Sequence, residues 1–145
     1  MRTNDKIGGG YYFCKPFRNF VNCWFKPGTF GGKSPVARLA NLRRDHGNIE
    51  MECYLPMPKA TKAEYEAVEH HTKMILLRRF PELTHKGNDH FGFTTSKEEY
   101  REKLAQYRDA TMEIAMDYCD TYDIPYEEIV WPKLKKGGVH YGKRG

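Results

Sequence analysis

Four side chains in the first half of the chain are of the types that phosphodiester hydrolysis requires: Tyr12, Lys26, Arg38 and Glu69. Such a reaction needs a group that takes or orients the proton of the attacking water, and cations that stabilise charge on the phosphate. It is also assisted by a divalent metal ion that polarises the phosphate. A single carboxylate with several waters suits Mg²⁺ or Mn²⁺, so Glu69 is the candidate metal ligand.

Two short strands are expected to place the first two of these side chains. Residues 11–13 and 21–26 are rich in aromatic and β-branched residues, and Pro27-Gly28 is expected to close the second strand. Adjacent strands can bring Tyr12 and Lys26 together on one face of a sheet.

A helix and a third strand are expected next. Ser34-Pro35 predicts the start of the helix, because serine caps a helix and proline fits its first position, and Gly47 predicts its end. This helix can direct Arg38 at the same sheet face. Residues 49–55 alternate between apolar and polar side chains, which predicts a half-buried strand ended by the prolines that follow.

Two capping boxes predict the remaining helices. Thr61-x-x-Glu64 opens a helix that ends before Pro81 and carries Glu69 on its apolar side. Ser96-x-x-Glu99 opens the longest helix, which continues to about Tyr122, and residues 84–95 are expected to be a loop.

The expected order of elements is that of an α/β or α+β domain, with a small, mostly antiparallel three-stranded sheet flanked by helices. Residues 1–9 are expected to be a flexible N-terminus and residues 10–95 the core that holds the candidate site. Residues 96–131 are expected to be a C-terminal helical extension, and residues 132–145 a basic flexible tail.

The order and spacing of these residues resemble the GIY-YIG nuclease superfamily, and more narrowly its phage-associated branch with Lys-x-Gly in the second half-motif. Gly10-Tyr11-Tyr12 matches the first half-motif and Lys26-Pro27-Gly28 the second. Arg38 matches the arginine-bearing helix, and Glu69 the helix with the metal-binding glutamate. The resemblance covers roughly residues 10–105.

The resemblance implies a role for each of the four residues. Tyr12 would be the general base or the group that orients the attacking water. Arg38 would bind the scissile phosphate, and Glu69 would hold the metal ion. Lys26 replaces the second motif tyrosine and would contact phosphate or activate water.

Charge is distributed unevenly along the chain, which has a net charge of +5. Residues 1–47 hold 9 Lys/Arg against 2 Asp/Glu, and residues 97–131 hold 4 against 10. The basic first part favours a DNA partner, although an ordinary solvated surface is the alternative. The side chains expected to contact phosphates are Lys33, Arg43, Arg44, Lys135 and Lys136.

Several classes of protein are excluded by composition. No run of 18 apolar residues is present, so no membrane span is expected. The four cysteines are scattered without a C-x-x-C pair, which argues against a zinc ribbon or a disulfide scaffold. We therefore expect a cytoplasmic protein, in a bacterial host cell if it is encoded by a phage.

Three functions remain open at this stage. The first is a metal-dependent DNA endonuclease associated with a phage or mobile element. The second is a catalytically weak nucleic-acid-binding module of the same fold. The third is an interaction protein that acts on a host factor, or that forms a homodimer through a heptad-like stripe over residues 100–118.

Overall fold

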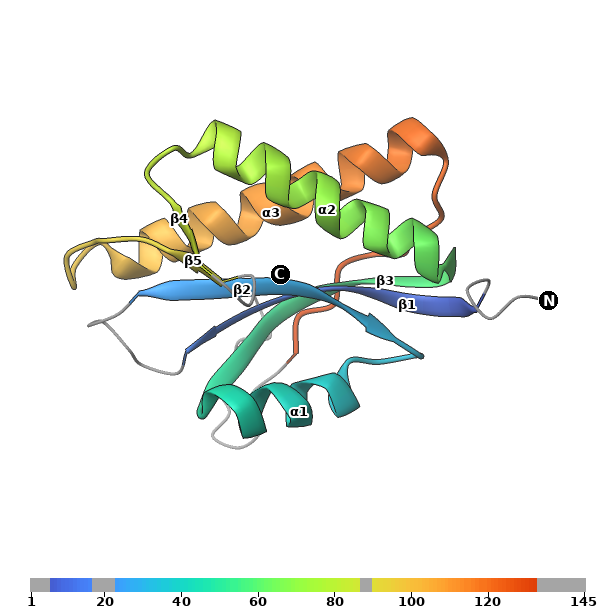
Figure 1. Cartoon of the computed structure of the whole chain (residues 1–145), viewed down its shortest axis with the longest axis horizontal. Helices are drawn as coiled ribbons and strands as arrows, with labels where there is room; N and C mark the ends of the chain where they lie inside the picture. Colours follow the sequence, from blue (N-terminus) through green and yellow to red (C-terminus); the bar gives the residue numbers. More distant parts are fainter. Residues whose placement is uncertain (1–5, 17–22, 87–89, 133–145) are drawn as a thin grey trace.

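The computed structural model describes residues 6–16, 23–86 and 90–132. These residues form an α+β domain in which helices cover both faces of one antiparallel sheet (Figure 1). The elements are β1 (Ile7–Pro16), β2 (Trp24–Gly31), α1 (Val36–His46), β3 (Ile49–Thr61), α2 (Lys62–Arg79), β4 (Thr84–Lys86), β5 (His90–Gly92) and α3 (Tyr100–Tyr122). The strand order in the sheet is β3-β1-β2-β5-β4.

The sheet therefore has five strands rather than the expected three. The two extra strands, β4 and β5, lie in the segment expected to be a loop, and each has only three residues. So short a strand cannot display an alternation of apolar and polar residues, which is why the sequence pattern missed both. At the other end of the chain, residues 7–9 belong to β1 instead of a flexible terminus.

Two strands run through prolines that were expected to end them. β2 continues past Pro27 to Gly31, and β3 continues past Pro56 and Pro58 to Thr61. Proline is tolerated where a strand has a free edge, because its missing N–H then costs no ladder hydrogen bond. β3 is the outer strand of the sheet, and Pro27 lies beyond the two β2 residues that pair with β5.

β3 contains a bulge, so the apolar residues that alternate along 49–55 do not all lie on one face of the sheet, as a regular strand would place them. The register against β1 shifts at Glu52, between Met51 and Cys53. Ile49 and Met51 consequently pack on the side of α1, whereas Cys53 and Leu55 pack on the side of α2 and α3. A shift of one residue exchanges the faces because side chains alternate along a strand.

The helices form separate layers. α1 covers one face of the sheet, and α2 and α3 lie together on the other (Figure 1). The larger core, between the sheet and α2 with α3, includes a group of aromatic rings in mutual contact: Phe13, Phe25, Phe91, Phe93 and Tyr107. None of the helices in the described part of the chain is long and apolar enough to cross a membrane.

The heptad-like stripe of α3 belongs to this core. Five of its six residues are buried within the domain: Tyr100, Leu104, Tyr107, Thr111 and Ile114. The sixth, Tyr118, is half-buried and packs against the same core. Since the stripe packs on its own chain, it gives no support to a homodimer. The helix begins at Tyr100 rather than at Ser96, whose hydroxyl instead accepts a hydrogen bond from the Glu99 amide at 3.2 Å in the preceding turn.

The start of α1 also differs from its sequence signal, because Pro35 and not Ser34 is the N-cap residue, without a side-chain cap hydrogen bond, and the helix begins at Val36. The remaining helix ends agree with their signals. The α2 capping box forms reciprocally: the Glu64 amide donates to Thr61 Oγ1 at 3.1 Å, and the Thr61 amide donates to Glu64 Oε1 at 2.9 Å. α2 ends at Arg79, and α1 ends at His46, followed by Gly47, whose φ of 81° favours glycine. These ends fix where α1 and α2 present Arg38 and Glu69.

Candidate active site

The candidate site lies at a free edge of β2. In the described part of the chain, β5 pairs with β2 only at Trp24 and Phe25. The rest of β2, as far as Gly31, is paired with β1 alone. α1 and α2 flank this edge from the two faces of the sheet, so side chains from both helices can reach it (Figure 1).

Tyr12 is held against this edge by its register in the sheet. It lies opposite Gly28 and packs on the α1 side of the sheet, where it is fully buried. A Cβ atom at position 28 would lie 2.7 Å from Tyr12 Cζ and closer still to its hydroxyl oxygen. Glycine is therefore required at position 28 to leave room for the phenol.

The Tyr12 hydroxyl has no well-formed hydrogen bond to any described residue. A buried polar group without a partner costs about 1–3 kcal/mol, and such groups concentrate at functional sites. The Arg38 guanidinium lies close enough to act on this hydroxyl, but the contact falls short of good hydrogen-bond geometry. The buried hydroxyl thus has hydrogen-bonding capacity that the described residues do not fully use.

The pKa of Tyr12 shows which groups surround it. Burial raises that pKa to about 12, and Arg38 opposes the rise, while Cys14 and Glu69 add to it. Arg38 and Glu69 therefore both lie within electrostatic reach of the hydroxyl, although their helices cover opposite faces of the sheet. Three of the four residues that the sequence selected therefore interact electrostatically, with Glu69 on the opposite side of the sheet from Tyr12 and Arg38.

Lys26 completes the group on the α1 side. It pairs with Cys14 in the sheet and is only 6% exposed, which is rare for lysine. Burial raises the pKa of the Cys14 thiol to about 12, and the Lys26 ammonium is the strongest of the charges that oppose this rise. Its positive charge accordingly lies in the sheet face that holds Tyr12.

The outer surface of α1 is basic. Lys33, Arg38, Arg43 and Arg44 are all exposed there or in the loop before it. Arg43 Nε donates to the Ile49 carbonyl at 3.1 Å, and Arg44 Nη2 donates to Asn41 Oδ1 at 2.8 Å. The two other expected phosphate contacts, Lys135 and Lys136, lie outside the described residues.

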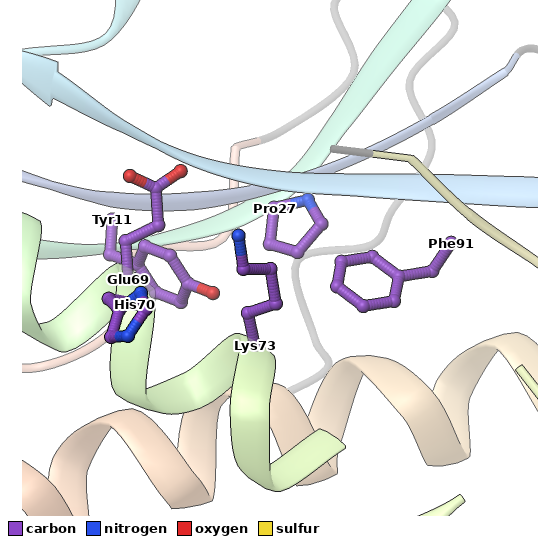
Figure 2. A pocket seen from close by; sticks show the side chains of 6 residues that line it. All are labelled: Tyr11, Pro27, Glu69, His70, Lys73 and Phe91. Carbon is purple, nitrogen blue, oxygen red and sulfur yellow. The ribbon is translucent and has the colours of Figure 1, made fainter. Parts of the chain in front are cut away.

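Glu69 projects from α2 into a pocket on the opposite side of β2. Figure 2 shows its carboxylate and the Lys73 side chain directed from α2 toward the sheet. The pocket is lined by Tyr11, Pro27, Glu69, His70, Lys73 and Phe91. Sequence reasoning did not select Lys73; the signal was its position four residues after Glu69, on the same helix face.

A metal ion at this site would have one protein carboxylate. Among the described residues, no group of three or more His, Cys, Asp and Glu side chains could hold a metal ion. Glu69 alone fits Mg²⁺ or Mn²⁺, which retain several waters, and does not fit a structural zinc site. Of the paired histidines on α2, His71 stacks on Tyr118 with 4.5 Å between ring centroids, and only His70 lines the pocket.

Comparisons with protein-family models, with curated proteins and with solved structures gave no match. The functional argument therefore depends on the residues and on their geometry.

Proposed function

We propose that this chain is a metal-dependent DNA endonuclease of the GIY-YIG type. The observation that carries the proposal is the buried Tyr12 hydroxyl, which has no well-formed hydrogen bond among the described residues and lies within electrostatic reach of Arg38 and Glu69. A water-orienting hydroxyl, a phosphate-binding cation and a metal-binding carboxylate are the parts that hydrolysis of a phosphodiester requires.

Each residue has a role that follows from its surroundings. Because the pKa of Tyr12 is about 12, its phenol is protonated at neutral pH, which favours orientation of the attacking water over removal of its proton. Arg38, whose long side chain is exposed, would bind the scissile phosphate. Lys26 adds positive charge beside the phenol. A divalent ion held by Glu69 would polarise the phosphate.

The charge of the two faces supports DNA as the substrate. The basic residues of α1 lie on one side of the sheet, and the acidic segment 97–131 includes α3 on the other (Figure 1). DNA would approach from the α1 side and the free edge of β2, away from α3. Action in the cytoplasm of a bacterial host, for a phage or mobile element, belongs to the same proposal.

Nicking of supercoiled plasmid at low salt tests the activity, in Mg²⁺, in Mn²⁺ and in EDTA. We expect metal-dependent nicking by the wild type. Glu69→Gln, Tyr12→Phe and Arg38→Ala should each reduce the rate about 10²- to 10³-fold, the usual cost of removing a group that stabilises the transition state.

Matched substitutions at exposed positions control for folding and for general effects of charge. They are Glu66→Gln on α2, Tyr122→Phe on α3 and Arg101→Ala on α3. These three variants should nick at the wild-type rate. Nicking that persists in EDTA, or that survives the Glu69 and Tyr12 substitutions, would contradict the proposed site.

One observation favours a second candidate, a nucleic-acid-binding module with weak catalysis. The pKa of Tyr12 is raised and a lysine replaces the second motif tyrosine, so neither group is a ready general base at neutral pH. Under this alternative, DNA binding would weaken steeply with salt while no metal-dependent cleavage is seen. A gel-shift assay run beside the plasmid assay separates the two candidates.

A further inference from the structure

The pocket beside Glu69 contains a second charged group whose role the nuclease proposal leaves open. It has room for about 100 Å³ and lies between α2 and the β1, β2 and β5 strands. Lys73 enters it from α2, one helical turn after Glu69, and both side chains are directed toward the sheet (Figure 2). The ammonium and the carboxylate therefore line the same small space.

The walls of the pocket strengthen the effect of these charges. Tyr11 and Phe91 are each 1% exposed, and Pro27 is also buried. Charges against apolar walls are screened less than charges in open water. Lys73 itself is only half-buried, so its ammonium can still meet a ligand from solution.

The pairing of opposite charges indicates the class of ligand. The ammonium of Lys73 suits an anion such as a phosphate, and the carboxylate of Glu69 is the group that would hold a divalent cation. A lysine ammonium is a common point-charge ligand of phosphate.

We propose that Lys73 binds a backbone phosphate of the DNA strand next to the scissile bond, on the α2 side of β2. This inference rests on the proposed function. Arg38 would hold the strand on the α1 side of the same edge. The strand would cross between them along the edge of β2 that β5 leaves unpaired.

The salt dependence of DNA binding tests this role without requiring cleavage. Fluorescence anisotropy with a labelled duplex would be measured in EDTA, from 50 to 200 mM KCl, for the full chain. Each phosphate contact steepens the plot of log K against log[salt] by about 0.9. Lys73→Gln should therefore reduce the slope by about 0.9, and Lys73→Arg should leave it unchanged.

Lys62→Gln is the matched control on the same helix. Lys62 is exposed at the start of α2 and lies 3.9 Å from Glu66, so its loss should leave the slope unchanged. Urea unfolding shows whether Lys73→Gln is folded. If it is not, Lys73→Met, which keeps the apolar stem, replaces it in the same measurement.

The outcomes separate this inference from the nuclease proposal. If a folded Lys73→Gln variant has the wild-type slope of log K against log[salt], the phosphate contact of Lys73 is overturned. The same holds if that slope is unchanged and only the Mg²⁺ requirement for nicking differs. A reduced slope supports it even if the wild type fails to nick plasmid, which would overturn only the nuclease. Absence of DNA binding by the wild type overturns both.

Discussion

Substitution of Gly28 by alanine tests whether the position of the Tyr12 hydroxyl matters. The new Cβ would lie 2.7 Å from Tyr12 Cζ, whereas ordinary contact begins at 3.4 Å, so the ring must move by about 0.7 Å. Tyr12 is fully buried and cannot move into solvent. The backbone of Gly28 does not have a positive φ, so the effect comes from this contact and not from backbone strain.

The displacement is large enough to measure in two ways. Overpacking of a core costs about 1–3 kcal/mol, which urea unfolding detects as a lower midpoint. A misplacement of about 1 Å in a catalytic site can cost about 10²-fold in rate, so we expect a fall in plasmid nicking of about one to two orders of magnitude. Gly31→Ala is the control, since its Cβ would lie 3.3 Å from the Tyr65 hydroxyl at an exposed position of the same strand.

A double-mutant cycle of Gly28→Ala with Tyr12→Phe tests whether the loss of nicking caused by Gly28→Ala depends on the Tyr12 hydroxyl. In the Tyr12→Phe background the hydroxyl is already gone, so Gly28→Ala should cause little further loss of nicking. Equal and independent losses in the two backgrounds would refute the idea that Gly28 acts through the Tyr12 hydroxyl. So would a Gly28→Ala variant with wild-type stability and rate.

Two further predictions concern stability. The pKa of Tyr12 is about 12 in the folded protein, whereas an unfolded tyrosine has a pKa of 10. The contribution of the neutral phenol to the free energy of unfolding is therefore fully present below pH 10 and is lost as the pH rises through 12. In urea unfolding, the wild type should therefore lose about 2 kcal/mol more than Tyr12→Phe between pH 9 and 12, and equal losses would count against the burial of this phenol. Arg108 donates to Glu52 at 2.8 Å and lies 4.9 Å from the centre of the Trp131 ring. Arg108→Ala should cost about 1–2 kcal/mol, whereas the exposed Arg101→Ala should stay within about 0.5 kcal/mol; similar values for both would show that the Glu52 contact contributes nothing.

The features predictable from sequence are those set by local chemistry. The Thr61–Glu64 capping box fixed the start of α2, and Gly47 fixed the end of α1, because both signals act within one turn of helix. From those ends the helical period places Glu69 on the sheet side of α2. The expectation that Tyr12 and Lys26 share a face is also confirmed, since β1 and β2 pair without a shift.

The features that sequence missed depend on contacts between distant segments. The Glu52 bulge exists only in the pairing of β3 with β1, and no residue type marks it. The strands β4 and β5 are defined by their partners and not by their own pattern. The Lys73 pocket likewise needs β5, because Phe91 closes one side of it, so a loop at that position would have left no pocket to expect.

The Lys26-Pro27-Gly28 segment explains why the free edge of β2 lies beside Tyr12. Pro27 has no amide hydrogen to offer a neighbouring strand, and the pairing with β5 ends two residues earlier, at Phe25. Gly28, next along the strand, has no side chain and so leaves room for the phenol opposite. A proline that offers no amide hydrogen and a glycine that leaves room for the phenol together shape the stretch of β2 beside which Arg38 and Glu69 lie on opposite faces. The residues that made this segment a poor strand in the sequence are therefore those that the proposed site requires.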